Sequence, residues 1–260
     1  MTPGAFAAGA AAAALGFSLR FNWWRPKHPG TPILMYHQVG PHRPGSRLNK
    51  WRVTEPDFGS QLDVLARRRA AGVALRTLFE KPADPAPRAV LTFDDGFDGV
   101  RTRALPLLLA RGFRATVFAV SGRTGGINDW DGETPGERLL TEAGLRELHA
   151  AGIEIGSHGA THRSLTKLTD AELAIEVAGS KEHLENILGA PVLSFCYPFG
   201  DFDDRVVEAV KSAGYRAATV IRGAIARDLS DPFRLPRVVV RGTNTLLDFR
   251  LALTRGRSKL

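Results

Sequence analysis

The chain has 260 residues, of which 43% are hydrophobic, which suits one large α/β domain or two small ones. Its formal net charge of +8 favours an anionic partner, such as a membrane surface or an acidic glycan. The sequence has no run of Lys and Arg interleaved with aromatic residues of the kind that would indicate nucleic-acid binding. The single cysteine, Cys196, excludes an internal disulfide and a cysteine-cluster zinc site.

An apolar, alanine-rich stretch without charged residues occupies residues 5–19. It is short for a membrane-spanning helix, which needs about 20 residues, but Trp23, Trp24 and the basic residues around them suit a membrane interface. We favour an uncleaved anchor, with a signal peptide or a leader without a role as alternatives. The prediction is therefore an N-terminal hydrophobic segment and linker at residues 1–31, a globular domain at residues 32–260, and a cell-envelope location with the membrane side left open.

The globular part alternates between apolar strands and amphipathic helices. Strands are predicted at residues 33–37, 89–93, 115–120, 153–157, 192–197, 217–221 and 234–240. Helices are predicted at residues 55–69, which Gly72 is expected to end, and at 100–111, 139–151, 169–188, 203–213 and 245–253. The alternation predicts parallel βα units, closed as a barrel or open as a sheet.

Two adjacent carboxylates, Asp94 and Asp95, follow the strand at residues 89–93. Adjacent residues of a strand point to opposite faces, so the pair can share one site only if the chain bends, and Gly96 can supply the bend. Two carboxylates this close need a compensating cation or donor, which a metal ligand beside a general base would provide. A surface Asp-Asp-Gly turn is the alternative.

Two histidines four residues apart, His158 and His162, follow the strand at residues 153–157. Spacing by four places both imidazoles on one face of a helical turn. Two histidines and one carboxylate form a metal-binding set that leaves positions open for water and substrate. We therefore predict a metal site that joins these histidines to the Asp pair.

The motifs Thr-Phe-Asp-Asp-Gly at residues 92–96 and His-Gly-Ala-Thr-His at residues 158–162 together resemble those of polysaccharide deacetylases, carbohydrate esterase family 4. The resemblance covers about residues 32–240. It implies an α/β fold, a distorted (β/α) barrel of seven or eight mostly parallel strands. It also implies that residues 32–260 form the catalytic domain.

The resemblance assigns roles to these residues. Asp95, His158 and His162 are expected to hold one divalent metal ion, most often Zn²⁺, with Co²⁺ or Ni²⁺ as alternatives. Asp94 is expected to be the general base that activates water.

A third motif, Phe-Cys-Tyr-Pro-Phe-Gly at residues 195–200, lacks the arginine usual in the family. It is similar to the variant in biofilm-type poly-N-acetylglucosamine deacetylases, which implies that the Tyr197 backbone N–H is an oxyanion donor. Arg237 is our candidate for orienting Asp94 in place of the missing arginine. The alternatives are an aromatic turn for Tyr197 and a surface position for Arg237.

No histidine follows His183, although the family's last motif normally ends in one. The Leu-Met-Tyr-His sequence at residues 34–37 has the same form near the N-terminus, as in the biofilm-type enzymes. His37 is therefore expected to be the general acid, in a barrel whose first strand lies beside the strand of Arg237. A structural histidine at a strand end is the alternative.

The predicted function is metal-dependent hydrolysis of N-acetyl groups on a glycan that contains N-acetylhexosamine. Trp130 is expected to form a wall against a sugar ring, with loop exposure or core packing as alternatives. O-deacetylation, action on a lipid-linked sugar, a non-catalytic glycan-binding relative and a non-haem Fe(II) oxygenase are the rival hypotheses. The expected partners are the N-acetylated glycan and a membrane surface, with no nucleic acid, and the expected state is a monomer.

Overall fold

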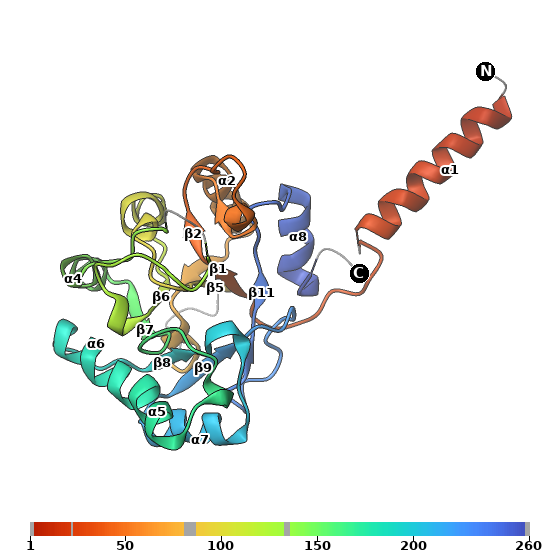
Figure 1. The fold of residues 1–260 in the computed structure, drawn as a ribbon. Helices are drawn as coiled ribbons and strands as arrows, with labels where there is room; N and C mark the ends of the chain where they lie inside the picture. The colour runs from red at the N-terminus through yellow and green to blue at the C-terminus, as the bar shows by residue number, and fades with distance from the viewer. Residues whose placement is uncertain (1–2, 22, 81–86, 133–135, 258–260) are drawn as a thin grey trace.

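The computed structural model describes residues 3–21, 23–80, 87–132 and 136–257. Its main strands are β1 (Ile33–Tyr36), β4 (Ala71–Val73), β5 (Arg88–Phe93), β6 (Thr116–Ala119), β7 (Glu154–Ser157), β8 (Ser194–Cys196), β9 (Ala217–Val220), β10 (Leu235–Pro236) and β11 (Val238–Val239). They form one parallel sheet in the order β10-β9-β8-β7-β6-β5-β1-β11, with β4 paired to β5 (Figure 1). A separate parallel pair consists of β2 (Gln38–Val39) and β3 (Arg52–Val53).

The sheet is nearly closed into a barrel by its last two strands. The edge strands β10 and β11 are separated in the chain by Arg237 alone, so the chain passes from one edge of the sheet to the other. β11 pairs with β1, with Leu34 opposite Val238. The predicted barrel of seven or eight mostly parallel strands is confirmed, with eight strands along the path from β10 to β11, as is the predicted neighbour relation between β1 and the Arg237 segment. The single strand predicted at residues 234–240 is wrong, because the pairing changes at Arg237.

The alternation of side chains along β5 determines which of them face the barrel interior. Leu91 and Phe93 belong to the large core, whereas Val90 belongs to a smaller core built by residues of strands around the whole barrel. A core shared by strands on all sides must be the interior. Because side chains alternate with a period of two, Thr92 and Asp94 face the interior with Val90.

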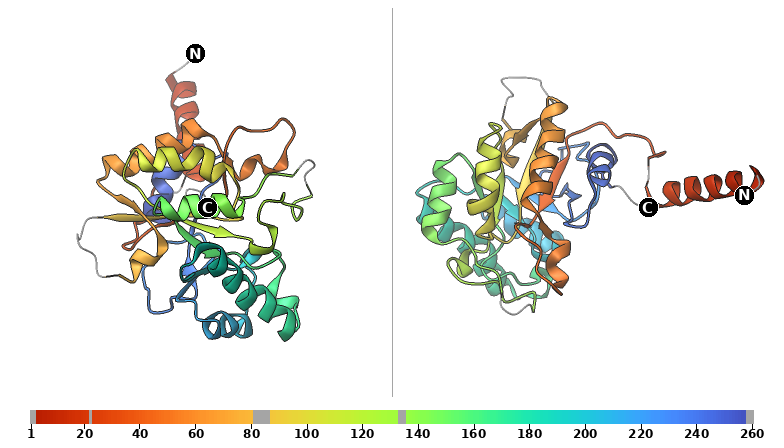
Figure 2. Two further views of the ribbon diagram at one scale, coloured as in Figure 1. Left: turned by 90° about the vertical axis from the view of Figure 1, so that its left-hand side faces the viewer. Right: turned by 90° about the horizontal axis from the view of Figure 1, so that it is seen from above.

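The helices of the body cover the outside of the barrel (Figures 1 and 2). Those that match single predicted helices are α2 (Glu55–Arg67), α4 (Glu142–Ala150), α7 (Asp204–Ser212) and α8 (Leu246–Arg255), each begun by a side-chain cap. Such caps satisfy amide groups that the first turn leaves without partners.

Two predicted helices are interrupted by π-helical segments. The helix at residues 100–111 consists of Val100–Ala104 in π form followed by α3 (Leu105–Leu109), where Pro106 lacks an amide N–H. The helix at residues 169–188 consists of α5 (Asp170–Ala174), the π segment Ile175–Gly179 and α6 (Ser180–Leu188).

Gly72 does not end α2, contrary to the sequence prediction. It lies in β4, where an added Cβ would lie 2.7 Å from the ring of Phe113. Glycine at this position therefore permits close packing and is not a helix cap.

The N-terminal helix α1 (Pro3–Arg20) extends away from the barrel (Figure 2). Arg20 in its last turn donates two hydrogen bonds, of 2.8 and 3.0 Å, to the buried carboxylate of Asp248 in α8. Further along, the His28 amide donates to the Thr254 carbonyl. Within the described ranges, no helix combines the length and apolar character needed to cross a membrane.

Candidate active site

A cleft of about 250 Å³ opens at the carboxyl ends of β1, β5 and β7. Parallel α/β barrels carry reactive side chains at this end, because the strand ends converge there and the loops that follow are free to vary. Six of the residues predicted from sequence line this cleft: His37, Asp94, Asp95, Trp130, His158 and His162.

The backbone bends at Asp95 so that both carboxylates reach the same region. Asp95 has a φ of 72° and Gly96 also has a φ of 72°, so the bend expected at the glycine begins one residue earlier. His162 has a φ of 60°, which is likewise uncommon for a residue with a side chain. The fold therefore holds two of the three predicted metal-binding residues in unfavourable backbone conformations, as functional sites often do.

Asp95, His158 and His162 form a compact, buried donor set. The Nε2 atom of each histidine lies 3.4 Å from Oδ1 of Asp95. All three ligand atoms lie within 4.8 Å of one another, which fits one divalent cation with mixed nitrogen and oxygen ligands. Burial raises the pKa of Asp95, but the two histidines beside it hold that pKa well below its usual range.

The main-chain carbonyl of Cys196 fixes the tautomer of His158. Nδ1 of His158 lies 2.7 Å from this carbonyl oxygen, which can only accept, so Nδ1 carries the proton. In the neutral ring, Nε2 is then the atom with a lone pair, and it faces Oδ1 of Asp95 in the donor set. Metal-binding histidines are commonly oriented in this way by a carbonyl or carboxylate behind them.

A second group of possible ligands, Asp94, His158 and Cys196, also lies within this distance. The guanidinium of Arg237 contacts both Asp94 and Cys196, at 2.8 and 3.2 Å from the same nitrogen. A cation at this second position would be repelled by Arg237. The set around Asp95 is therefore the better candidate metal site.

Arg237 lies in the barrel interior directly behind Asp94. Its two terminal nitrogens donate to the two carboxylate oxygens at 2.6 and 2.8 Å, and one of them also donates to Thr92 Oγ1 at 3.2 Å. Both side chains of the pair are almost fully buried. Burial raises the pKa of Asp94, but the charge and hydrogen bonds of Arg237 lower it by more. The pKa therefore lies below its usual range, and the carboxylate is held ionised. This is the position proposed from sequence for an orienting arginine.

His37, directly after β1, lines the cleft with the two aspartates. Its ring packs on Trp51 with a centroid distance of 4.5 Å. Burial lowers the pKa of His37, and the charges of Asp95 and Asp94 oppose that effect. Nδ1 of His37 is buried without a hydrogen-bond partner among the described residues, so the ring has a free polar atom in the cleft region.

Trp130 stacks on the His162 ring with a centroid distance of 4.5 Å and an interplanar angle of 22°. It comes from the long connection between β6 and α4, of which residues 133–135 lie outside the described ranges. Trp51 and Trp130 therefore bring aromatic surface to the cleft from two separate loops.

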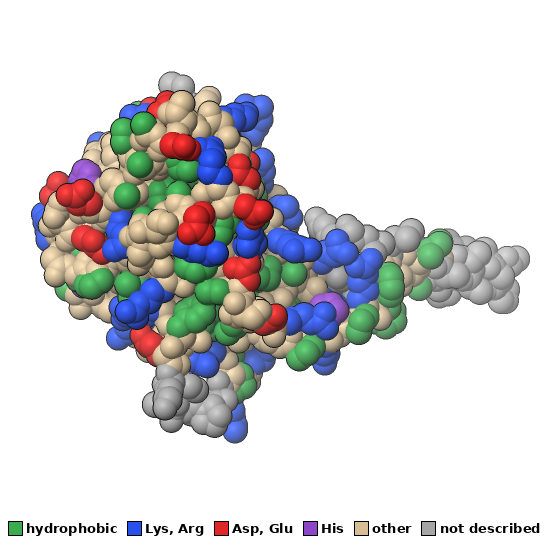
Figure 3. Space-filling model, turned by 90° about the horizontal axis from the view of Figure 1, so that it is seen from below, with side chains coloured by type: hydrophobic (Ala, Val, Ile, Leu, Met, Phe, Trp, Pro, Cys, Tyr) green, Lys and Arg blue, Asp and Glu red, His purple; other side chains and the backbone are tan. Residues whose placement is uncertain are grey.

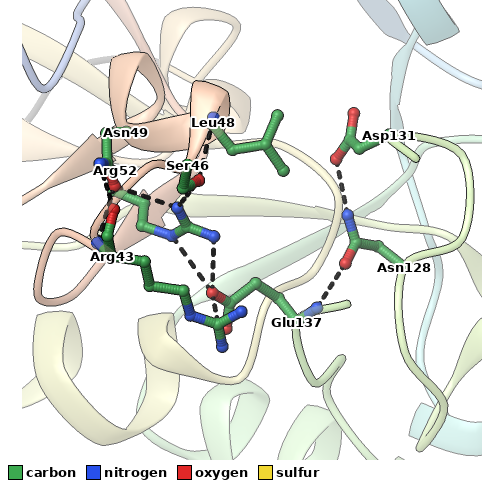
Figure 4. A network of polar contacts seen from close by, with 8 residues as sticks. All are labelled: Arg43, Ser46, Leu48, Asn49, Arg52, Asn128, Asp131 and Glu137. Carbon is green, nitrogen blue, oxygen red and sulfur yellow. Dashed lines mark hydrogen bonds and ion pairs between the residues drawn. The ribbon is translucent and has the colours of Figure 1, made fainter. Parts of the chain in front are cut away.

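An ion-pair network joins these two loops, and no pattern in the sequence predicts it. Glu137 accepts from Nε and one terminal nitrogen of the buried Arg52, at 3.1 and 2.8 Å, and also pairs with Arg43 at 2.9 Å (Figure 4). The side chain of Asn128 accepts a hydrogen bond of 2.6 Å from the Glu137 backbone amide and donates one of 2.6 Å to the Asp131 carboxylate. The network ties the loop before β3 to the loop that carries Trp130.

Glu176 is another residue that sequence analysis missed. It lies in the π segment Ile175–Gly179, is buried, and accepts from the amides of Ala160 and Thr161 at 2.8 and 2.9 Å. The Thr161 hydroxyl also donates to it. Glu176 thus holds the turn that separates the two metal-binding histidines. The signal in the sequence was an acidic residue on the same helix face as the apolar residues Leu173 and Val177, where a buried carboxylate needs partners.

Tyr197 is buried outside the cleft lining. Its hydroxyl donates to the Phe233 carbonyl at 3.0 Å, so the side chain points away from the metal-binding set. The next-but-one residue, Phe199, has a φ of 59° and lines the cleft against His162. The role predicted for the Tyr197 amide stays a prediction.

Comparisons with known proteins agree with this geometry. Residues 81–218 match the family model for polysaccharide deacetylase. The chain is 28% identical over 216 residues to YxkH of Bacillus subtilis, named as a polysaccharide deacetylase, covering 79% of this chain and 70% of that one. It is 22% identical to the poly-beta-1,6-N-acetyl-D-glucosamine N-deacetylase of Staphylococcus aureus, covering 74% of this chain and 69% of that one. The crystal structure of the Bacillus cereus polysaccharide deacetylase BC0361 has a TM-score of 0.74 and 25% identity, covering 87% of this chain and 69% of that one.

Proposed function

Since the chain belongs to the polysaccharide deacetylase family, we propose that it is a metal-dependent hydrolase that removes N-acetyl groups from a glycan containing N-acetylhexosamine. One observation carries the proposal. An ionised carboxylate, Asp94, is held by Arg237 beside a donor set of Asp95, His158 and His162 in a single cleft. A glycan-binding module would need no buried base next to a metal site.

Asp95, His158 and His162 would hold one divalent cation, for which zinc is our proposal because two imidazoles and a carboxylate suit it. A cation held there supplies Lewis-acid chemistry and makes water more acidic. Asp94 takes a proton from the attacking water, and Arg237 keeps Asp94 ionised and oriented for that step.

Hydrolysis breaks the bond between the acyl carbon and the sugar nitrogen, and that nitrogen must gain a proton to leave. His37 is our candidate donor, because it lines the cleft with Asp94. Its lowered pKa makes the protonated ring a stronger acid than an exposed histidine. The products are acetate and a free amine on the sugar, and the proton taken up by Asp94 returns to solvent. The Tyr197 amide remains our candidate donor to the developing oxyanion.

Trp130 and Trp51 would bind the sugar by stacking on its apolar face. The relative from Staphylococcus aureus is named for a poly-N-acetylglucosamine substrate, which supports an N-acetylated polymer as the substrate class. O-acetyl groups and lipid-linked N-acetyl sugars are the alternatives. A cell-envelope location and a monomeric state belong to the proposal, and the apolar residues 5–19 support the former.

Acetate release from a panel of substrates tests this function. Zinc-loaded protein is incubated with N-acetylated glucosamine oligomers, O-acetylated glycans and a lipid-linked N-acetyl sugar, with Asp94→Asn as the control. Acetate released from the oligomers by the wild type only, lost with a chelator and restored by zinc, is the expected result. Acetate from the O-acetylated glycans alone would replace the proposal by esterase activity, and binding without acetate release would make the chain a glycan-binding relative.

A further inference from the structure

A recess of about 400 Å³ lies where the N-terminal segment meets the end of α8, outside the active-site cleft. It is lined by Arg25, His28, Arg222, Arg227, Arg255 and Arg257, and by the short stretch at residues 223–225. None of the described residues that line it is an aspartate or glutamate. The recess therefore gathers five arginines from three separate segments of the chain without an acidic lining residue.

Arg222 and Arg227 are exposed at this recess. Guanidinium groups bind phosphate with two parallel hydrogen bonds and are weakly hydrated, so a cluster of them is suited to a phosphate-bearing ligand. The lining thus indicates an anionic ligand.

Arg255 links the recess to an exposed aromatic pair. Its Nε donates to the Arg25 carbonyl at 2.9 Å, and a terminal nitrogen donates to the Trp23 carbonyl at 2.7 Å. The guanidinium of Arg25 lies 5.4 Å from the ring centroid of Trp24. Trp23 and Trp24 are 50% and 53% exposed, although large aromatic side chains are normally buried. The aromatic pair and the arginines therefore belong to one surface.

This surface lies where α1 joins the body of the molecule. In Figure 3, Lys and Arg side chains gather with hydrophobic side chains at the place where the N-terminal segment leaves the body. The sequence of α1 is apolar up to Arg20, its one charged residue. Exposed tryptophan, clustered arginine and an adjoining apolar helix are the three features that bind proteins to an anionic lipid surface.

We propose that the arginine recess binds the phosphate groups of anionic phospholipids at a membrane surface, with Trp23 and Trp24 entering the interface beside it. Free phosphate would satisfy the arginines, but it would leave the exposed tryptophans and the apolar helix without a role. The proposal does not depend on the hydrolase function, because the recess shares no lining residue with the active-site cleft.

The test compares vesicle binding of the full chain and of the double variant Arg222→Gln/Arg227→Gln. Vesicles of phosphatidylcholine alone and of phosphatidylcholine mixed with phosphatidylglycerol are used at low ionic strength. Each arginine near an anionic surface contributes about a fivefold gain in partitioning, so the double variant should bind the mixed vesicles roughly 30-fold more weakly. Lys167→Gln/Arg216→Gln removes the same charge from exposed positions elsewhere and should retain most of the binding.

Equal binding of the mixed vesicles by wild type and the Arg222/Arg227 variant would overturn the proposal, as would an equal loss in the Lys167/Arg216 control. Calorimetry with inorganic phosphate distinguishes the other source of the same chemistry. If the Arg222/Arg227 variant loses phosphate binding but still binds vesicles as the wild type does, the recess is a site for free anions and not for phospholipids. Circular dichroism spectra and urea unfolding midpoints should be the same in all three proteins and show that the variants are folded.

Discussion

Replacing Arg237 by methionine tests the buried ion pair that supports the proposed base. Both side chains of the pair are almost fully buried, at 0% and 2% exposure, and two hydrogen bonds of 2.6 and 2.8 Å join them. Removing one member of such a pair leaves an uncompensated buried charge, which costs about 3–5 kcal/mol. Arg237→Met should therefore lower the free energy of unfolding by this amount at neutral pH.

The matched control is the exposed pair of Arg103 and Glu55, whose side chains are 42% and 46% exposed. Water screens this pair, so Arg103→Met should cost about 1 kcal/mol or less. Urea unfolding in the presence of a chelator measures both variants without differences in metal content. Adding Asp94→Asn to Arg237→Met removes the stranded charge, so the double variant should be more stable than the sum of the single losses predicts, by about 1–3 kcal/mol.

The pH dependence of the stability that Arg237→Met loses gives a second check. Arg237 lowers the pKa of Asp94, so in the wild type the pair stabilises the fold above about pH 4, and this is lost as the pH falls through the folded-state pKa. In Arg237→Met, burial raises that pKa against only the weaker opposing charges of His158 and His37, so stability falls as the pH rises through it. The difference between the two proteins should grow from pH 4 to pH 7. A difference that is independent of pH, or no larger than that of Arg103→Met, would refute the reasoning.

The remaining predictions concern the metal site and the two proton-transfer groups. His158→Ala and His162→Ala should each lower metal content, measured by elemental analysis, because each removes one of the candidate ligands; unchanged content would contradict the assignment. Asp94→Asn should keep the metal and reduce kcat about 10²–10⁴-fold, whereas activity that follows metal occupancy would make Asp94 a ligand. His37→Ala should slow hydrolysis of an N-acetyl sugar more than hydrolysis of an activated acetyl ester, because an alkoxide leaves without a proton more readily than an amine does. Equal losses on both substrates would remove His37 as the acid. Glu176→Ala should weaken zinc affinity about 10–100-fold in competition with a chelating dye, because the turn between the two histidines loses its acceptor. Unchanged affinity would mean that the backbone holds this turn without Glu176.

The sequence determined the strands that carry the site and the positions of the reactive residues along them. A continuous apolar run at residues 89–93 predicts a buried strand whatever it packs against, and β5 occupies residues 88–93. Asp95 and His158 lie just after the ends of β5 and β7, and His162 follows His158 by one turn, so the convergence of parallel strands predicts that they meet. The adjacency of β1 and the Arg237 segment was expected from the resemblance, because it implies a barrel in which the first strand, with His37 at its end, lies beside the last.

Local pattern did not predict how helices break or which glycine packs closely. Gly72 packs closely on Phe113, which is distant in sequence, and Glu176 in the second π segment accepts from the amides of Ala160 and Thr161 on a different loop. The periodicity of apolar residues shows only that one face of a segment is buried. It contains no information about a single neighbour that shifts the hydrogen-bond pattern.

Only the tertiary structure decided which polar residues support the site. Arg237 meets Asp94 across 143 positions of sequence, and Arg52 meets Glu137 across 85. Each is one arginine among many in a basic chain, and its partner is fixed by where the barrel closes or where two loops cross. The residues that bind and react are therefore found from the strand ends, and Arg237 from the arginine that the third motif lacks. Arg52, Glu137 and Glu176 are found only once the fold brings distant segments together, because a charge buried away from water needs a partner and only the fold decides which one is near.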